Sequence, residues 1–241
     1  MSVAAFAPHL QDTVDRFARS LTVPSALLEI HPRRKGHPGK YAALAPAITV
    51  GVVSAFEGFA EDFLAMVLYL QGQSFAQVTK KADLTNPSLV DFKNVIIRDF
   101  PSVKSKLGVD FEETLWRPPA VGAKSWWKAE PIGWEKLLEE SQAWIQVRHC
   151  LSHGLTSGWS TERWPGPATK GGNKSEVPWA KEVLRPMRGG KHSLVIHGAI
   201  SCARIYRAGA VHLADLVAEE IGQKLSWNKV PEFPLGPEPK K

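Results

Sequence analysis

The residues best suited to chemistry in this chain lie together in one stretch, Arg148-His149-Cys150-Leu151-Ser152-His153-Gly154. An arginine binds phosphate through a fork of N–H donors, and a histidine takes up or releases a proton near neutral pH. Arg148 and His153 are five residues apart, which on an ideal helix is about 140° around the axis. The two side chains therefore do not share a helix face. They meet only if the last turn unwinds or a partner chain completes the site.

Two other kinds of site are open to the same stretch. His149 and His153 are four residues apart on one helix face, so both rings could bind one metal ion. The zinc-protease pattern needs a glutamate directly after the first histidine, where this chain has Cys150, and no third ligand follows at a recognisable spacing. Cys150 itself could be a nucleophile, but the C-terminal end of a helix opposes thiolate formation. We therefore expect no metal and a structural cysteine.

The stretch resembles the signature of HEPN-domain ribonucleases. That signature is an arginine, a polar residue, three more residues and a histidine near the end of a helix, here Arg148, His149 and His153. Gly154 follows as a helix stop, and the upstream segment 54–63 looks like the family's preceding helix. The resemblance covers residues 46–153 and, more loosely, the last helix. It is to HEPN ribonucleases of the toxin and defence type, with no subfamily assigned.

The resemblance implies a metal-independent endoribonuclease that needs no cofactor and acts as a homodimer with a composite active site. His153 would carry the proton of the ribose 2′-hydroxyl or of the leaving 5′-oxygen, and Arg148 would hold the scissile phosphate. His149 would contact phosphate or replace His153 as proton carrier, and Glu57 would orient Arg148 or a histidine. The products would be a 2′,3′-cyclic phosphate and a 5′-hydroxyl, and an antitoxin or regulatory protein is a further expected partner.

The alternative is a catalytically silent HEPN module that binds RNA or a protein. An intact Arg148 and His153 favour the enzyme, because a silent module need not keep both. A toxin paired with a nucleotidyltransferase typically has a tyrosine two residues after the motif histidine, and this chain has Leu155 there. The same spacing recurs at Arg207 and His212, where it suits a mid-helix surface because no helix stop follows.

One cluster interleaves aromatic and basic residues, as nucleic-acid binding surfaces do: Lys124, Trp126, Trp127 and Lys128. We name these four as candidate RNA-binding residues, although a buried tryptophan edge is the more common role. The net charge of +6 permits an anionic partner without establishing one.

Hydrophobic periodicity predicts a mostly α fold, a bundle of four to five helices in a single domain over residues 1–227. The resemblance implies that this bundle is HEPN-like. The clearest signal is the stripe from Val52 to Leu70 in a predicted central helix 46–70. A long loop insertion is expected over 156–190, and a Pro/Lys-rich tail over 228–241 is expected to be disordered. The other expected elements are helices at 9–21, 74–81, 89–100, 132–153 and 200–225, a loop at 22–40 and a short strand at 193–196.

We expect a soluble cytoplasmic protein. The N-terminus has no basic leader, no stretch reaches the roughly 18 uninterrupted apolar residues of a membrane span, and two cysteines weakly suggest a reducing compartment.

Overall fold

The computed structural model describes residues 9–34, 39–82, 84, 87–117, 128–154 and 180–236 of the chain. The described part is mostly helical, which confirms the predicted α class. Its helices are α1 (Leu10–Ser20), α2 (Thr22–Ile30), α3 (Leu44–Leu70), α4 (Phe75–Ala82), α5 (Leu89–Asp99), α6 (Trp134–Ser152) and α7 (Ile196–Glu220). Its strands form two antiparallel pairs, β1 (Glu113–Arg117) with β2 (Lys128–Ile132) and β3 (Arg185–Pro186) with β4 (His192–Ser193).

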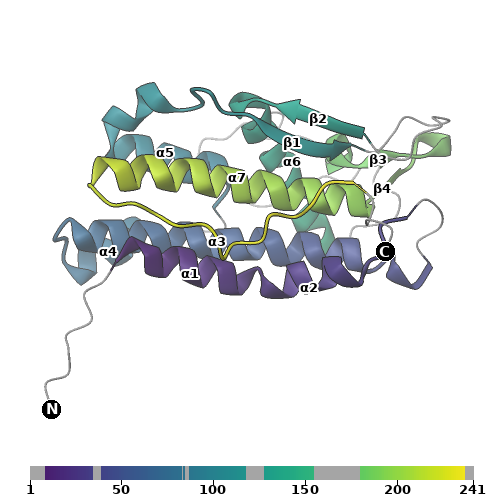
Figure 1. Cartoon of the computed structure of the whole chain (residues 1–241), viewed down its shortest axis with the longest axis horizontal. Coiled ribbons are helices and arrows are strands. Elements are labelled where there is room, and N and C mark those ends of the chain that lie inside the picture. The colour runs from purple at the N-terminus through teal and green to yellow at the C-terminus, as the bar shows by residue number, and fades with distance from the viewer. Residues whose placement is uncertain are drawn as a thin grey trace, which may run out of the picture.

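The long helix α3 is the centre of the bundle. It contacts α1 and α2, which follow one another along one of its sides, and it contacts α6 and α7 elsewhere (Figure 1). The β1–β2 hairpin lies on the far side of α7 from α1 and α2 (Figure 1). This arrangement holds the C-terminal part of α6 against the middle of α3.

The predicted apolar stripe of α3 is the core. Val52, Phe56, Phe59 and Phe63 are at most 3% exposed. Phe92 of α5 packs edge-on against three of these rings at centroid distances of about 6 Å. Truncating one such buried phenylalanine to alanine typically costs about 3–5 kcal/mol of folding free energy. The stripe therefore fixes the position of α3 and of the polar residues on its other faces.

The predicted loop over 22–40 is wrong in its first half, because Thr22–Ile30 is the helix α2. Proline usually breaks a helix, but Pro24 lies in the first turn, where its missing N–H costs no intrahelical bond. Pro24 is buried against Gly51 of α3, where the Cβ of any other residue would come within 2.8 Å of the Pro24 ring. Only glycine allows this approach of α2 to α3.

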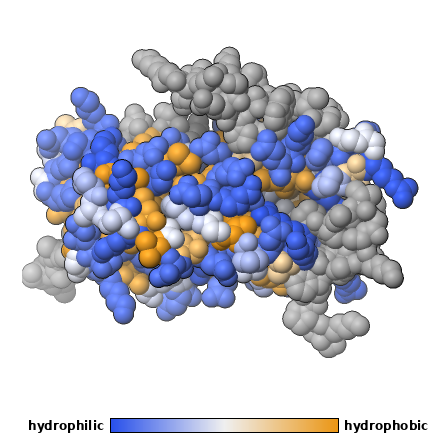
Figure 2. All heavy atoms as spheres, turned by 90° about the horizontal axis from the view of Figure 1, so that it is seen from above, coloured by the Kyte–Doolittle hydropathy of each residue, from blue (hydrophilic) through white to orange (hydrophobic). Residues whose placement is uncertain are grey.

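The hairpin was not anticipated from the sequence, which predicted no element between the helices at 89–100 and 132–153. Trp116 of β1 is fully buried, and its backbone N–H and C=O both bond to the hydroxyl of Ser201 on α7, at 3.1 and 2.8 Å. Seen from above in Figure 2, this side of the molecule carries a band of hydrophobic side chains between hydrophilic ones.

The predicted strand 193–196 is right only at Ser193. His192 and Ser193 form β4, whereas Ile196 already belongs to α7, which begins four residues before the expected start at 200 and ends at Glu220. Of the predicted insertion 156–190, residues 156–179 lie outside the described residues, and 180–190 contain short 3-10 turns and β3.

The predicted disorder of 228–241 is wrong up to residue 236. This segment returns along α7, shown in yellow in Figure 1, and buries Val230 and Phe233 to 3% and 1% exposure. Arg204 of α7 donates hydrogen bonds to the carbonyl oxygens of Glu232 and Phe233, at 3.1 and 3.0 Å. A proline-rich chain can lie extended without a strand partner when its apolar side chains fill a groove. Residues 237–241 are outside the described part.

The segment Gly39–Leu70, which contains α3, is long and apolar enough to cross a membrane by length and composition alone. Half of its most apolar window is buried inside the protein, as expected for the core helix of a bundle.

Candidate active site

The end of α6 carries the predicted motif. The helix is regular to Ser152, and His153 is its C-cap residue, whose backbone N–H donates to the carbonyl of His149 at 3.0 Å. Gly154 follows with φ +69°, the left-handed conformation that ends helices and favours glycine. The predicted glycine stop is thereby confirmed. The last turn does not unwind to bring His153 onto the face of Arg148.

Arg148 is held by a carboxylate from another helix. Its Nη2 donates to Oε2 of Glu57, in the middle of α3, at 2.9 Å. The two side chains are only 18% and 12% exposed, so the pair is largely shielded from water. Burial raises the pKa of Glu57, while the adjacent Arg148 acts to lower it and the neighbouring Glu61 adds to the rise. The contact between these two predicted site residues is present in the structure.

Glu57 uses one of its two oxygens in this pair. Oε2 accepts from Arg148, whereas Oε1 is buried and accepts no hydrogen bond within the described part of the chain. Beneath the pair lies Tyr206 of α7, which is fully buried and donates its hydroxyl to the Ser141 carbonyl at 2.8 Å. Its pKa is raised, first by burial and also by nearby charges that include Glu57. Tyr206 is thus fixed in the core next to the pair, and no motif in the sequence pointed to it.

His149 lies on the other side of the guanidinium. Its Nδ1 is 3.4 Å from Nη1 of Arg148, and the ring accepts this N–H when its own proton is on Nε2. Burial lowers the pKa of His149 to about 4, with the charges of Arg148 and His153 adding to the effect. His149 is therefore a neutral acceptor at pH 7. This state suits it to hold Arg148 and does not suit it to donate a proton.

His153 differs from His149 in its surroundings. It lies at the exposed end of α6, one turn beyond His149, and is close enough to influence the titration of that ring. The structure thus brings Glu57, Arg148 and His149 into one connected group and leaves His153 at the edge of that group, facing solvent.

The competing interpretations of the motif fit the geometry less well. Cys150 is completely buried in the core, where it cannot meet a substrate. No three His, Cys, Asp or Glu side chains come together as a metal-ion site within the described ranges, so His149 and His153 have no third such ligand there.

The second arginine–histidine pair at the same spacing, Arg207 and His212, also has a structural explanation. His212 is half-buried, accepts a hydrogen bond from the Gly108 N–H at 3.0 Å, and packs against aromatic rings. It is not the surface residue that we expected.

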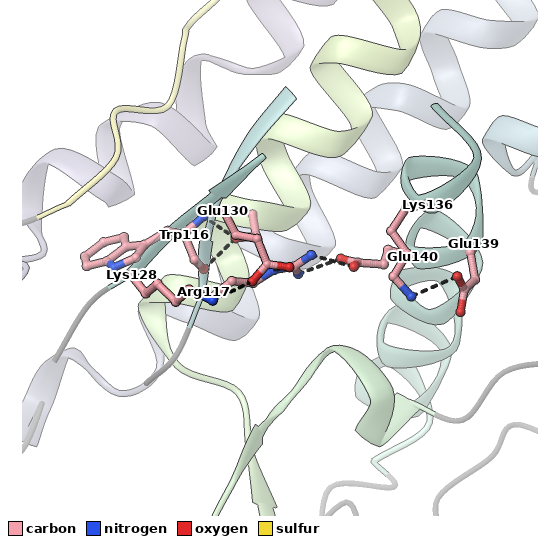
Figure 3. Close-up of polar contacts among 8 residues, drawn as sticks. Trp116, Arg117, Lys128, Glu130, Lys136, Glu139 and Glu140 are labelled. Atoms are coloured by element: carbon pink, nitrogen blue, oxygen red, sulfur yellow. Dashed lines mark hydrogen bonds and ion pairs between the residues drawn. The ribbon is translucent and has the colours of Figure 1, made fainter. Parts of the chain in front are cut away.

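Three of the four candidate RNA-binding residues, Lys124, Trp126 and Trp127, lie outside the described residues. Lys128 is the first residue of β2 and pairs with Glu130 at 3.2 Å (Figure 3).

The C-terminal end of β1 is anchored to α6. Arg117 makes a two-pronged ion pair with Glu140, at 2.7 and 2.6 Å (Figure 3). Glu140 is 7% exposed and precedes Arg148 by eight residues, about 12 Å along the same helix. The hairpin therefore has a fixed position relative to the arginine of the motif.

Comparisons with protein-family models, curated proteins and solved structures found no match to this chain.

Proposed function

We propose that the protein is a metal-independent endoribonuclease of the HEPN type. The observation that carries this proposal is the arrangement of Arg148, which is clamped between Glu57 and the neutral ring of His149, beside the exposed His153 at the end of α6. A fixed guanidinium next to a histidine is the minimum equipment for cleaving RNA, because RNA supplies its own nucleophile.

The reaction follows from these groups. His153 takes the proton of the ribose 2′-hydroxyl as the 2′-oxygen attacks phosphorus. Arg148 donates to the non-bridging oxygens and neutralises the charge that grows on them. The bond from phosphorus to the 5′-oxygen breaks, and that oxygen receives a proton from the protonated His153 of a second copy. A 2′,3′-cyclic phosphate and a 5′-hydroxyl result.

The composite site belongs to the same proposal. α6 remains helical to Ser152, so Arg148 and His153 of one chain point in directions about 140° apart. A second copy that presents its own motif to the same site would place its histidine on the side of Arg148 and would supply the second proton carrier. We propose a cytoplasmic homodimer in toxin–antitoxin or phage-defence systems, restrained by an antitoxin or regulatory protein.

One observation favours the alternative, a silent module that binds RNA or protein. Arg148 is only 18% exposed and already has a carboxylate partner, which is also the environment of an arginine that merely ties α6 to α3. The two functions differ in whether RNA is cut.

The test is to incubate the purified protein with RNA in excess EDTA and to compare wild type with Arg148→Ala and His153→Ala. Arg16→Ala is the matched control, because Arg16 is also paired with a carboxylate from α3, Asp62 at 2.7 Å, but its side chain is 42% exposed. We expect cleavage by wild type and Arg16→Ala and none by the two motif variants. Equal activity in all four proteins, or in none, would rule out the proposed enzyme.

A further inference from the structure

The corner between α3 and α4 exposes two aromatic side chains to solvent. Tyr69, in the last turn of α3, is 57% exposed, and Phe75, the first residue of α4, is 84% exposed. Single exposed apolar side chains are common, but contiguous apolar patches mark contact surfaces, and here two large aromatic side chains flank one short turn. The corner is thus a candidate contact surface.

α4 gives this surface a positive charge. Its last turn carries Lys80 and Lys81, both exposed, and the chain has no acidic residue between Asp62 and Asp83. The end of α5 continues the surface, because the pKa of Asp99 is lowered by a hydrogen bond from Arg98 and, more weakly, by Lys81. Exposed Arg98 and Lys81 therefore lie near the same Asp99 carboxylate, which pairs with Arg98 at 2.8 Å.

The short helix α4 contributes few side chains to the core. Ala82 is buried and Val78 is partly buried, while the other six residues of α4 are exposed. Its first turn is fixed locally, since the side chain of Gln77 accepts from both the N–H and the hydroxyl of Ser74 at 2.9 Å. The core gains little from α4, so its main effect is to hold Phe75 and the lysines in place on the surface.

The solvent-facing side of α3 connects this corner with the candidate active site. Gly58, Glu61, Ala65 and Tyr69 recur at intervals of three and four residues and are at least partly exposed, starting directly beside Glu57. From Glu57 to Tyr69 the helix rises by about 18 Å. A single strand lying along this side could reach both the corner and the end of α6.

We infer that the α3–α4 corner binds unpaired RNA, with bases stacking on Phe75 and Tyr69 and phosphates contacting Lys80, Lys81 and Arg98. This inference rests on the proposed function for its ligand and names the substrate class as single-stranded RNA. Aromatic rings beside cationic groups are the usual equipment of single-strand binding surfaces, because every base has a face to stack and every nucleotide a phosphate. An apolar protein partner would explain the rings but not the lysines.

The experiment measures binding of a fluorescent single-stranded DNA oligonucleotide by anisotropy. DNA lacks the 2′-hydroxyl and cannot be cut by the proposed chemistry, so the readout does not depend on cleavage, and stacking is tolerant of the sugar. We expect Phe75→Ala to weaken binding by about 5- to 150-fold, the range for losing one stacked base. Phe75→Tyr should retain binding. Val23→Ala, a truncation of a similarly exposed side chain on α2, is the matched control and should not change it.

Charge reversal tests the phosphate contacts. Lys80→Glu combined with Lys81→Glu should flatten the dependence of log K on log salt by about 0.7 for each lost contact. Cleavage of labelled RNA, followed in parallel, should require more RNA in Phe75→Ala and recover at saturation.

Three outcomes would overturn the inference: equal binding by wild type and Phe75→Ala, tighter binding of duplex than of single strands, or a change of oligomeric state in Phe75→Ala, which would mark the corner as a protein interface. Binding at the corner without any cleavage of RNA would instead refute the proposed enzyme and leave the surface standing.

Discussion

Glu57 and Arg148 are 91 residues apart in the chain, and their side chains form an ion pair of 2.9 Å between the middle of α3 and the end of α6. Burial of such a pair costs desolvation, which the attraction and hydrogen bond offset only while both partners are present. The pair therefore fixes the direction of the guanidinium, and it makes either partner costly to remove alone.

The first prediction concerns this coupling. Glu57→Ala and Arg148→Ala should each lower the free energy of unfolding by about 2 kcal/mol, because each leaves a largely buried charge without its partner. The double variant should lose less than the sum of the two, as residues in direct contact do. Urea denaturation of the four proteins measures the coupling.

Arg98→Ala provides the control for an exposed pair and should stay within about 0.5 kcal/mol of wild type. Strictly additive losses in the Glu57 and Arg148 variants would show that the 2.9 Å contact does not operate in solution.

The second prediction is a loss of stability in acid that depends on His149. The folded-state pKa of His149 is about 4, below the ordinary histidine value of 6.5, so the unfolded chain binds a proton in a pH range where the folded protein does not. The resulting stability is present above pH 6.5 and is lost as the pH falls through about 4. His149→Asn should make the unfolding free energy fall less between about pH 7 and pH 5.

His31 and His212 also have lowered pKa values because of burial, so part of the acid sensitivity should remain in the variant. An unchanged pH dependence in His149→Asn would mean that this ring is already solvated and titrates normally.

The sequence predicted the helices well where apolar residues repeat over many turns. The stripe of α3 extends through six apolar side chains from Val52 to Leu70, of which the first four are buried and the last two are partly buried against the core. The helix stop at Gly154 was equally readable, because a left-handed residue at a helix end favours glycine.

The elements that the sequence did not predict depend on distant partners. α2 contains a proline that is harmless only in a first turn and fits only against Gly51. The tail to residue 236 is ordered because Arg204, on α7, reaches its carbonyl groups. In the site, the family resemblance led us to expect that Glu57 orients Arg148 or a histidine, but the local pattern did not single it out, because Glu57 is one of several carboxylates on its helix. Its contact with Arg148 arises from the packing of α3 on α6. Local patterns carry no information about such pairings.

The third prediction ranks the two histidines of the motif. His153→Ala should reduce RNA cleavage by about 10²-fold or more, the usual scale for losing a general acid–base group. His149→Ala should cost less, because a ring with a pKa of about 4 holds Arg148 and does not donate protons at pH 7. His149→Asn, which keeps an acceptor near Arg148, should be closer to wild type than His149→Ala. Single-turnover cleavage rates decide the order, and a greater loss in His149→Ala than in His153→Ala would reverse the assignment.

The fourth prediction tests the composite site. The protein should be a dimer by light scattering across micromolar concentrations. Arg148→Ala and His153→Ala should each be inactive, but a mixture that has exchanged subunits should regain part of the cleavage activity, because a mixed dimer contains one intact arginine and one intact histidine. A monomeric wild type would place the whole site within one chain, and a mixture that stays inactive would show that one arginine and one histidine from different copies are not sufficient for cleavage.

The fifth prediction separates the proposed chemistry from a metal site at His149 and His153. With a 2′-hydroxyl as nucleophile, excess EDTA leaves cleavage intact, and the products resist ligation at the 3′ end until the cyclic phosphate is opened. If both rings held a metal, chelation would abolish cleavage, and either histidine variant would lose metal and activity alike. Metal analysis of the purified protein and the EDTA assay distinguish the two cases.

Stoichiometric zinc with EDTA sensitivity would establish the metal site. We expect neither, because Nδ1 of His149 faces the positive guanidinium of Arg148 at 3.4 Å, and Cys150, at the position where a zinc protease has its glutamate, is completely buried.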